Sequence, residues 1–561
     1  MQIEIHPDAA AMGRSAASQA AVILRTAIRE RGWARMIVAT GASQFEVLDA
    51  LVAEPDIEWS RVEAFHLDEY VGLSVDHPAS FRRYLRERFA GRVPLAAFHE
   101  LDAESDPQAT CDRVGRELRR IDRPIDVALV GVGENGHLAF NDPPADFAAE
   151  TPYHVVALDE ACRRQQVGEG WFGSLDEVPT HAISMTVAEI LRASVVVCSV
   201  PDERKAAAVA ATLGPVCPNV PASALRLHPD CRLLLDEPAA SRIDRSRLVE
   251  RNGLTRRLPP MVDLQVNGFA GVDFNADDLT TDQFATASAA LAKDECEFLP
   301  TLITDAPDRM RDRCRRLAAA IAAFEGRGPL GIHLEGPFLN ASPGYIGTHP
   351  AQHAGEADWE LMQSLLDAAD GQVRMVTLSP ECDPGGELTA WLTDRGITVF
   401  AGHSDATLDQ LGAAIDAGLS GFTHLGNGCP QTLPRHDNIV SRVLSLRNDL
   451  AISLIGDRVH LPPHVLSTWL SDRRFAFLVS DATAAAGLGP GRYTLAGQDV
   501  VVADDGVPWA ADRSHFVGSA TPLAAMRETL FDLGLSEGRI VAATLTTPLE
   551  ALGLSALRHF A

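Results

Sequence analysis

Four apolar stretches in the second half of the chain each lead into a residue that could hold or activate a metal-bound water. These residues are Glu335 after GIHL, His403 after FAG, His424 after GFT and Asp481 after FLVS. A carboxylate and two imidazoles can hold a divalent cation with an open position for water, and a further carboxylate can move that water's proton. A single histidine more often makes a structural hydrogen bond, so the prediction depends on all four residues together.

A second set of polar residues follows apolar runs in the first half of the chain. The run that ends at Thr40 leads into Gly41, Ala42 and Ser43. A helix expected from Gln44 onward would point backbone N–H groups at a phosphate in this place. The alternative is a tight glycine turn without a ligand.

Two adjacent carboxylates, Asp68 and Glu69, come directly after the apolar run 62–67. The carboxyl ends of strands are where open α/β sheets bind their ligands. One of the two could instead cap a helix or lie in a solvated loop.

Glycines in the stretch 131–136 satisfy the GxGxxG pattern, but prolines at 143 and 144 exclude the helix that a dinucleotide site needs. We therefore expect the glycines to let the backbone approach another kind of ligand. They present His137 beside Asn135 and Asp142, which could set its tautomer and basicity.

The elements that must position these residues differ between the two halves. In the first, buried strands over 35–40, 62–67 and 125–130 and an amphipathic helix over 11–32 predict an open Rossmann-like α/β/α sandwich spanning residues 1–240.

The second half, residues 259–561, contains eight apolar bursts, most of them separated by helical stretches. The bursts are Met261–Val266, Glu297–Ile303, Leu330–Leu334, Arg374–Leu378, Ile397–Ala401, Gly421–His424, Ala451–Ile455 and Phe475–Val479. Eight strand–helix repeats predict a (β/α)8 TIM barrel, whose catalytic groups lie at the carboxyl ends of the strands. The four metal-site candidates all fall at such ends.

Residues 241–258 separate the two halves and contain arginines at positions 242, 245, 247, 251, 256 and 257. Asn252-Gly253 and the nearby Pro259-Pro260 are typical of turns and loops. We interpret this stretch as a linker, whose charge is either a solvated face or a docking surface.

Composition excludes several classes of function. A net charge of −27 argues against nucleic acid or an anionic membrane as a partner and favours small polar substrates. No apolar run reaches the roughly 18 residues of a membrane span, and the N-terminus does not resemble a signal peptide. The nine cysteines are scattered without a CxxC pair, which predicts reduced thiols and a cytoplasmic protein.

The stretches ATGAS, FHLDEYVGL, GVGENGHLAFNDP and HAISMTVAEIL resemble glucosamine-6-phosphate deaminases, also called isomerases, over nearly all of residues 1–237. The resemblance implies that Asp68 moves a proton between C2 and C1, and that His137 opens the sugar ring with help from Asn135 and Asp142. It also implies a reaction without a metal or other cofactor. The implied phosphate-binding residues are Gly41, Ala42, Ser43 and Lys205.

Three positions depart from that family. Many members carry Asp at the position of Asn135, Glu at that of Asp142, and a phosphate-binding arginine at that of Gly170; Arg163 and Arg164 lie nearby. Lactonases and sensors share the fold, so a sugar-phosphate sensor is an alternative for this half.

The stretches PPMVDLQVNGFAGVDFN, GIHLEGPF, GTHP, AGHSDAT, THLGNG and LVSDATAAAGL resemble N-acetylglucosamine-6-phosphate deacetylase, a metal-dependent amidohydrolase, over about residues 259–555. Gln265 and Asn267 stand where most amidohydrolases have an HxH pair for a second metal. The resemblance therefore implies one divalent cation, expected to be Zn²⁺. Its implied ligands are Glu335, His403 and His424, with Asp481 as the proton-transfer group. The implied substrate contacts are His349, Asn427, Gly428, Arg435 and His460.

Two further expectations come from this second family. Its members can take an arginine and a histidine of the site from a neighbouring subunit, which implies a homo-oligomer, either a dimer or a larger assembly. They also carry a small β-sandwich built from strands before and after the barrel. Here the first expected barrel strand follows the linker directly and the chain ends at Ala561, so we expect this sandwich to be missing.

The sequence thus predicts a bifunctional enzyme of amino-sugar catabolism. The barrel would hydrolyse N-acetylglucosamine 6-phosphate to acetate and glucosamine 6-phosphate, and the N-terminal half would convert that product to fructose 6-phosphate and ammonia. One alternative is an active barrel with an N-terminal sensor. The other is the same pair of reactions on another amino-sugar phosphate, such as the galactosamine epimer.

Overall fold

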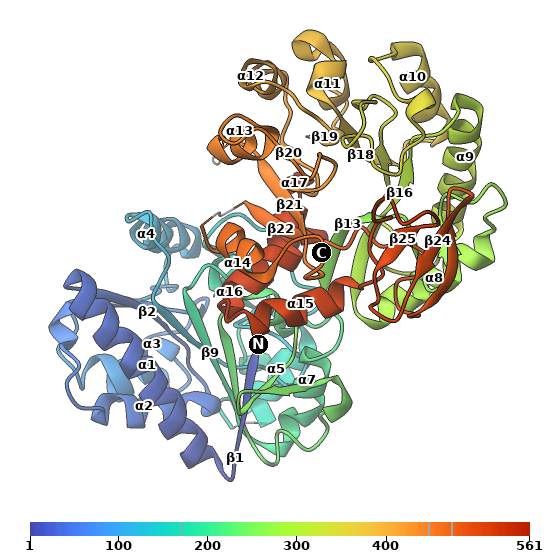
Figure 1. Ribbon diagram of the computed structural model, residues 1–561. Coiled ribbons are helices and arrows are strands. Elements are labelled where there is room, and N and C mark those ends of the chain that lie inside the picture. Colours follow the sequence, from blue (N-terminus) through green and yellow to red (C-terminus); the bar gives the residue numbers. More distant parts are fainter. Residues whose placement is uncertain (169, 447–448, 473–474) are drawn as a thin grey trace. The chain divides into compact units, whose positions relative to one another are not determined.

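The computed structural model describes residues 1–168, 170–446, 449–472 and 475–561, and its chain forms two compact units. The first unit contains Met1–Pro259 and Leu557–Ala561, and the second contains Pro260–Ala556. Figure 1 colours the chain from blue at the N-terminus to red at the C-terminus.

The first unit is built on a nine-stranded sheet in which seven neighbouring strands run parallel. Its strands, in spatial order, are β11 (Val249–Arg251), β12 (Leu254–Arg256), β1 (Gln2–His6), β10 (Cys231–Asp236), β9 (Val195–Val200), β6 (Val127–Val130), β2 (Ala34–Val38), β3 (Val62–His66) and β5 (Ala97–His99). A smaller sheet is formed by β4 (Asp68–Tyr70), β8 (His181–Met185) and β7 (Tyr153–Ala157). The central strands β2 and β6 are wholly buried, as expected for a parallel sheet covered on both faces. This confirms the predicted Rossmann-like fold.

The arginine-rich stretch differs from the predicted linker. Its strands β11 and β12 form a hairpin, and β12 pairs antiparallel with β1, opposing Gln2 to Arg256. The turn is Asn252-Gly253, and both residues have positive φ values, 52° and 73°. Asn-Gly is the preferred pair for such a two-residue hairpin turn. Here it connects two strands of the sheet and is not part of a loop between domains.

Helices of the first unit carry clear end signals. Asp8 caps α1 (Ala9–Arg31) by accepting the Ala11 N–H at 2.7 Å, and Gly32 ends it with φ 85°. The other helices are α2 (Phe45–Ala53), α3 (Phe81–Leu85), α4 (Pro107–Arg119), α5 (Glu160–Gly168), α6 (Val187–Ile190) and α7 (Ala206–Thr212). Figure 1 shows α1 and α2 in blue, and they pack together beside the sheet.

The second unit contains an eight-stranded parallel sheet whose strands follow one another in chain order. They are β13 (Met261–Val266), β16 (Cys296–Ile303), β17 (Ile332–Glu335), β18 (Val373–Leu378), β19 (Thr398–Ala401), β20 (Gly421–Phe422), β21 (Ala451–Ile455) and β22 (Ala476–Val479). A parallel bridge between Val266 and Ala482 joins the first strand to the residues after the last. The sheet therefore nearly closes on itself, which confirms the predicted TIM barrel.

Strand register brings the strand ends to one rim of the barrel. Glu335 lies opposite Thr377, Ala401 opposite Phe422, and Ile455 opposite Val479. Residues that directly follow these strands therefore meet at the same rim.

Helices surround this barrel. They are α8 (Thr281–Lys293), α9 (Pro307–Ala323), α10 (Trp359–Ala368), α11 (Glu387–Thr393), α12 (Leu408–Asp416), α13 (Ile439–Ser445), α14 (Pro463–Asp472), α15 (Leu523–Asp532), α16 (Glu537–Val541) and α17 (Thr547–Ala551), and α18 (Ala556–His559) follows them. Thr280 with Gln283 and Thr407 with Gln410 form capping boxes at α8 and α12. Within the described ranges, no helix is both long and apolar enough to cross a membrane.

Two small sheets extend from the barrel. One pairs β14 (Gly268–Phe269) with β15 (Val272–Asp273), and the other contains β23 (Gly491–Leu495), β24 (Gln498–Val502) and β25 (Pro508–Ala510). Both are inserted between barrel elements. In the part of the chain that the structure describes, no β-sandwich is built from strands on the two sides of the barrel.

Candidate active sites

The first candidate site lies where the strand order of the first unit reverses. From β2 the chain continues to β3 on one side, whereas β6 and then β9 lie on the other. Ligands of open α/β sheets bind at such a point. A cavity of about 70 Å³ lies here, and its lining includes Gly41, Ser43, Asp68, His137, Gln166 and Lys205. The structure thus brings together five of the residues that the sequence predicts, namely Gly41, Ser43, Asp68, His137 and Lys205, and adds Gln166 from α5.

Two glycines are needed for the loops to approach so closely. A Cβ on Gly131 would lie 2.6 Å from the Ser43 hydroxyl oxygen, and a Cβ on Gly133 would lie 2.2 Å from His137 Nε2. At these distances a side chain at either position would force Ser43 or the His137 ring to move. The GxGxxG pattern therefore serves loop packing around His137, as the rejection of a dinucleotide site implied.

Asp68 and Glu69 have separate environments because successive residues of a strand point to opposite faces. Asp68 lines the cavity and is buried, and its Oδ1 has no hydrogen-bond partner among the described residues. Burial, and then the charge of Glu69, raise the pKa of Asp68 to about 8. Such a carboxyl group can take up and release a proton near neutral pH.

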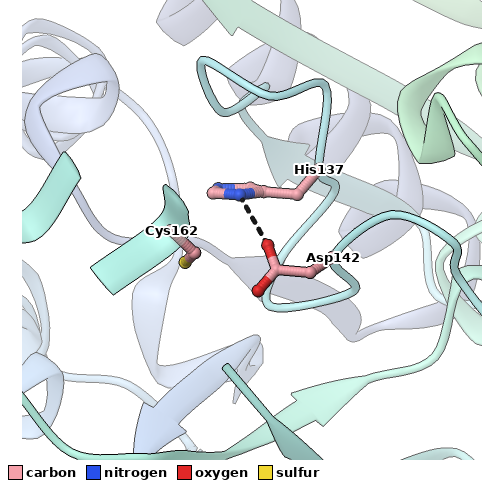
Figure 2. Close-up of side chains that lie close together, drawn as sticks. All are labelled: His137, Asp142 and Cys162. Atoms are coloured by element: carbon pink, nitrogen blue, oxygen red, sulfur yellow. Dashed lines mark ion pairs between the residues drawn. The ribbon is translucent and has the colours of Figure 1, made fainter. Parts of the chain in front are cut away.

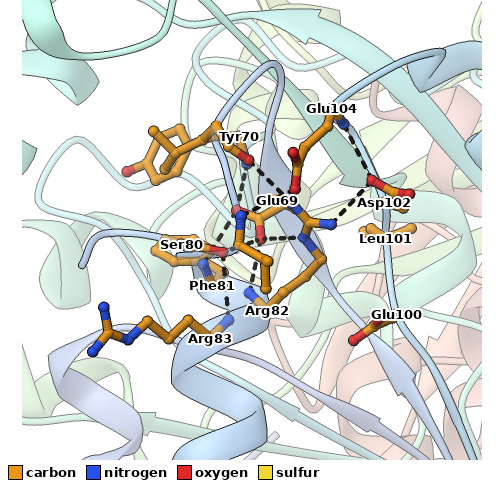
Figure 3. A network of polar contacts seen from close by, with 12 residues as sticks. Glu69, Tyr70, Ser80, Phe81, Arg82, Arg83, Glu100, Leu101, Asp102 and Glu104 are labelled. Carbon is orange, nitrogen blue, oxygen red and sulfur yellow. Dashed lines mark hydrogen bonds and ion pairs between the residues drawn. The ribbon is translucent and has the colours of Figure 1, made fainter. Parts of the chain in front are cut away.

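Glu69 holds the first turn of α3 in place. Its carboxylate accepts hydrogen bonds from the N–H groups of Tyr70 (2.9 Å), Phe81 (3.2 Å) and Arg82 (2.7 Å), and from the Ser80 hydroxyl (3.1 Å). Figure 3 shows Arg82 beside it, linked in turn to Asp102 and Glu104. Of the two adjacent carboxylates, Glu69 is therefore the one that caps a helix, which leaves Asp68 for the cavity.

His137 is oriented by two neighbours on its own loop. Its Nδ1 lies 3.1 Å from Asp142 Oδ1 (Figure 2). Its backbone N–H donates to Asn135 Oδ1 at 3.1 Å. Asn135 Nδ2 donates to the same Asp142 oxygen at 3.2 Å, and the Asp159 N–H donates to the other at 3.1 Å. Burial alone would raise the pKa of Asp142, but these contacts, first among them that of His137, hold it below its usual value. Asp142 is therefore a carboxylate that can stabilise a charged His137.

The remaining candidates of the first unit fall into two groups. Lys205 reaches the cavity, where its Nζ donates to the Val132 carbonyl at 2.8 Å. Arg163 instead donates to the carbonyls of Leu175 and Val178, and the exposed Arg164 pairs with Glu160. Neither arginine lines the cavity, and in the described part of the chain no atom beyond the chain neighbours of Gly170 lies within 4 Å of where its Cβ would be. The backbone of Ala42 lies in the turn after β2, but its side chain is outside the described part of the chain.

The second candidate site lies at the rim of the barrel. His403 Nε2 and His424 Nε2 lie 3.3 Å and 3.0 Å from the same oxygen, Glu335 Oε1, and all three residues are buried. Gln265 donates to this oxygen at 2.9 Å. One ligand atom from each of Glu335, His403 and His424 lies within 4.8 Å of the other two, which is close enough to hold one ion.

Hydrogen bonding supports a cation between these groups. His403 Nδ1 lies 2.7 Å from the Tyr345 carbonyl, which only accepts, so Nδ1 carries a proton and Nε2 of the neutral ring presents a lone pair. A lone pair and a carboxylate oxygen repel each other unless a proton or a metal ion lies between them. Two nitrogens, one carboxylate oxygen and no thiolate form a donor set that suits Zn²⁺ or a similar divalent ion.

Three of the rim residues have strained backbones. His403, His424 and Asp481 have φ values of 50°, 35° and 49°, in the left-handed region that residues with a side chain rarely adopt. Such strain costs about 1–3 kcal/mol per residue and is typical of functional sites. It turns each side chain into the barrel mouth directly after its strand.

Asp481 lies beside the predicted metal ligands. Asn267 Nδ2 donates to its Oδ1 at 2.7 Å. Burial, and then the charge of Glu335, raise the pKa of Asp481 to about 6. Gln265 and Asn267, which we expect in place of an HxH pair, thus each make a hydrogen bond, one to Glu335 and one to Asp481.

The rim opens into a cavity of about 780 Å³, a size typical of pockets for small metabolites. Its lining includes the predicted His349, Asn427, Gly428 and His460. His349 Nδ1 accepts the Thr304 N–H at 3.3 Å, so its proton is on Nε2, 3.7 Å from Glu335 Oε2.

His460 and Gly428 are held in place by close contacts. His460 Nδ1 lies 2.6 Å from Asp457 Oδ2, which fixes the ring. A Cβ on Gly428 would lie 2.9 Å from His403 Nδ1. Arg435, by contrast, is exposed and does not line the cavity, so its phosphate role and the homo-oligomer stay predictions.

Sequence reasoning missed one wall of the cavity. Trp509, His515 and Phe516 line it from the end of the three-stranded sheet, and the Phe516 ring lies 4.5 Å from that of Trp509 and 5.3 Å from that of His460. No motif marks these residues in the sequence. Only the pairing of β24 with β25 brings them back over the barrel mouth.

Comparison with known proteins identifies relatives of the first unit. Residues 7–233 match the family described as glucosamine-6-phosphate isomerases/6-phosphogluconolactonase. A glucosamine-6-phosphate deaminase of Streptococcus pneumoniae (strain Hungary19A-6) is 35% identical over 210 residues, which are 37% of this chain and 86% of the relative.

Two solved structures are similar to separate parts of the chain. One is a variant of N-acetyl-D-glucosamine-6-phosphate deacetylase from Mycobacterium smegmatis in complex with N-acetyl-D-glucosamine-6-phosphate. It has 30% identity and a TM-score of 0.49, covering 53% of this chain and 78% of that one. The other is a monomeric glucosamine-6-phosphate deaminase, with 29% identity and a TM-score of 0.40, covering 43% of this chain and 100% of that one.

The curated deaminase, at 35% identity over most of its length, decides the assignment of the first unit. Through this unit, the chain belongs to the glucosamine-6-phosphate deaminase family.

Proposed function

We propose that the chain catalyses two consecutive reactions. The barrel releases acetate from N-acetylglucosamine 6-phosphate, and the first unit converts the resulting glucosamine 6-phosphate to fructose 6-phosphate and ammonia. The observation that carries the first step is the convergence of Glu335, His403, His424 and Asp481 at one barrel rim. Membership of the deaminase family carries the second.

In the barrel, Glu335, His403 and His424 would hold one divalent cation, expected to be Zn²⁺. When bound, such an ion lowers the pKa of a water ligand and polarises an amide carbonyl. Asp481 takes the proton of the attacking water. Its pKa of about 6 leaves it mainly ionised at neutral pH, and once protonated it can deliver the proton to the departing amine.

The chain's own residues would also orient the substrate in the barrel. His349 carries its ring proton on Nε2 and directs it toward the metal site, where it can donate to the acetyl oxygen. Asp457 holds the His460 ring at the cavity wall for a sugar or phosphate oxygen. Asn427 and Gly428 provide the adjoining loop.

In the first unit, Asp68 and His137 would divide the proton transfers. His137, backed by Asp142, protonates the ring oxygen and opens the sugar. Asp68 then moves a proton from C2 to C1, a task for which a pKa of about 8 is well placed. Gly41, Ser43 and Lys205 bind the phosphate at the strand ends.

The departures at Asn135 and Asp142 are consistent with an active site. Asn135 donates a hydrogen bond to Asp142, which an ionised aspartate in its place could not do. The pair keeps one negative charge beside His137 and fixes its position. This contact favours a deaminase over the sensor alternative.

The test compares ammonia and acetate released by the intact protein from N-acetylglucosamine 6-phosphate. The wild type should release the two in a ratio near one, and a chelator should stop both. Asp481→Asn should release neither from this substrate but should still form ammonia from added glucosamine 6-phosphate. Asp68→Asn should release acetate alone.

The alternatives have distinct outcomes in the same assay. Acetate without ammonia, together with binding of glucosamine 6-phosphate but no turnover, would replace the deaminase with a sensor. Faster turnover of the galactosamine epimers at both steps would change the substrate instead. A chelator that leaves acetate release intact would contradict the metal-dependent barrel mechanism.

A further inference from the structure

The first candidate site contains a thiol that the proposed reaction does not use. Cys162, on α5, is 1% exposed, and its Sγ lies within 4.8 Å of both a His137 ring nitrogen and an Asp142 carboxylate oxygen. Figure 2 shows the three side chains, with the ion pair of His137 and Asp142 dashed. They come from two elements, since His137 and Asp142 lie on the loop after β6.

Existing contacts already hold these two elements together. The Asp159 N–H, just before α5, donates to Asp142 Oδ2 at 3.1 Å. The Cys162 N–H in turn donates to Asp159 Oδ1 at 2.5 Å. The thiol is therefore held next to the carboxylate by the backbone as well as by packing, and the cluster is preorganised.

The three donors suit a borderline-soft divalent cation. One imidazole nitrogen, one carboxylate oxygen and one thiolate sulfur are each ordinary ligands of Zn²⁺, whereas Mg²⁺ and Ca²⁺ require oxygen ligands. The 3.1 Å between His137 Nδ1 and Asp142 Oδ1 is close to the spacing of two ligands on one tetrahedral ion. His137 Nδ1 is also a buried nitrogen that has no well-oriented hydrogen-bond partner among the described residues.

We propose that His137, Asp142 and Cys162 form a Zn²⁺ site that inhibits the first unit. On binding, the Cys162 S–H bond breaks, its proton leaves to water, and the sulfur bonds to the ion. His137 Nδ1 gives its lone pair to the ion, and any proton that it held also leaves to water. Thiolate and carboxylate together neutralise the two positive charges, so the buried complex carries no net charge.

The inhibition rests on the proposed deaminase role of His137. An ion between His137 and Asp142 replaces the contact through which the carboxylate stabilises a protonated ring, so His137 can no longer protonate the sugar. It also ties α5 to the loop after β6. Gln166 of the same helix lines the small cavity, so a fixed α5 would restrict entry of a sugar phosphate. The metal expected to activate the barrel would thus slow the first unit.

Cobalt provides a test that does not depend on either activity. Metal-depleted intact protein is titrated with Co²⁺ while the thiolate-to-cobalt charge-transfer absorption is followed. The site of Glu335, His403 and His424 has no thiol, so this band reports a thiolate site alone. Wild type should show the band, and Cys162→Ser should lose it.

Two matched variants control for the loss of a thiol. Cys429→Ser removes the cysteine that lines the barrel cavity, and Cys111→Ser removes another buried cysteine of the first unit. Both should keep the band. Absence of the band from wild type, its persistence in Cys162→Ser, or its loss in either control variant would overturn the site, and absence from wild type does so even if Cys162→Ser fails to fold.

Inhibition is then measured with glucosamine 6-phosphate and Zn²⁺, each variant being compared with its own metal-free rate. Wild-type ammonia release should fall by about tenfold or more and recover with chelator. Cys162→Ser should need on the order of ten times more Zn²⁺ for the same loss. Unchanged turnover at Zn²⁺ levels that displace the cobalt band would overturn the inhibition, whereas a protein with no turnover even without metal would contradict the proposed deaminase and not the site.

Discussion

Glu335 of the barrel and Asp68 of the first unit are both buried carboxylates at the carboxyl end of a parallel strand. Their pKa values nevertheless shift in opposite directions from the usual values. Burial alone raises the pKa of each. At Glu335, the neighbouring His403 and His424 rings outweigh burial and hold the pKa well below its usual value. Asp68 has no such partner among the described residues, and its pKa rises to about 8. Partners, more than burial, therefore decide whether a carboxylate binds a cation or carries a proton.

The two sites also differ in how they are supported. In the barrel, three candidate site residues lie two positions after the ends of β19, β20 and β22 and take strained backbone angles there. In the first unit, the site combines loops after four strands with α5, and a buried ion network around Glu69 lies behind it. The barrel site thus depends on strand ends, and the first on contacts between loops.

The largest expected effect separates the two activities. Asp481→Asn should lower the turnover number for deacetylation by about 10²- to 10⁴-fold, because it removes the group that moves the water proton. Ammonia release from added glucosamine 6-phosphate should stay at the wild-type rate. Steady-state assays with each substrate check this. A parallel fall in both activities would show that the two sites do not act separately.

The ion network around Glu69, which lies behind Asp68, should lose much of its stabilising effect when one buried charge is removed. Arg82→Leu leaves Glu69 buried with its main cation gone and should cost about 3–5 kcal/mol of unfolding free energy. The matched change Arg83→Leu removes an exposed pair with Glu87 and should cost less than about 1 kcal/mol. Denaturant unfolding measures both, and equal costs would show that the network does not support the unit.

Asp68 itself should make the first unit less stable as the pH rises. Its folded pKa of about 8 is above the usual value of 3.8, so the folded state holds the proton more tightly than the unfolded chain. Stability is then lost between about pH 4 and pH 8, by at most about 1.4 kcal/mol per pH unit. Asp68→Asn has no such proton, so its melting temperature should exceed that of wild type by more at pH 8 than at pH 5. The same difference at both values would rule out the raised pKa.

The smallest expected effect concerns the wall that the sequence did not reveal. Phe516→Ala should raise KM for N-acetylglucosamine 6-phosphate by about three- to tenfold, because it removes an aromatic contact from the barrel cavity. The turnover number should change little, since no proton-transfer residue is altered. Turnover of glucosamine 6-phosphate is the internal control, and a large fall in barrel turnover number with unchanged KM would contradict a binding role.

Much of the barrel could be predicted because its signals are local. Each strand is a short apolar run, and all eight observed strands begin and end within two residues of the predicted bounds. The predicted positions of His403, His424 and Asp481 follow from this, since each lies at the end of such a run or two residues beyond it. The aromatic wall of Trp509 and Phe516 could not be predicted, because it depends on how a later hairpin folds back.

The first unit shows where local signals fail. Asn252-Gly253 is typical of both a loop and a hairpin turn, and only the free edge of β1 makes the hairpin part of the sheet. Likewise, Asp68 and Glu69 are adjacent carboxylates, and the sequence does not show which of them faces the cavity. The packing of α3 against Glu69 is what gives the two carboxylates different roles.

By itself, the sequence determined the order of the barrel strands, the position of Glu335, His403, His424 and Asp481 near strand ends, and the resemblance to the deaminase family. These follow from periodicity and short motifs, which act over a few neighbouring residues. Tertiary structure alone decided which carboxylate carries a proton, which histidine nitrogen faces Glu335, and how Cys162 meets His137 and Asp142. Those outcomes depend on burial and on hydrogen bonds between residues distant in the chain, and no local pattern encodes them.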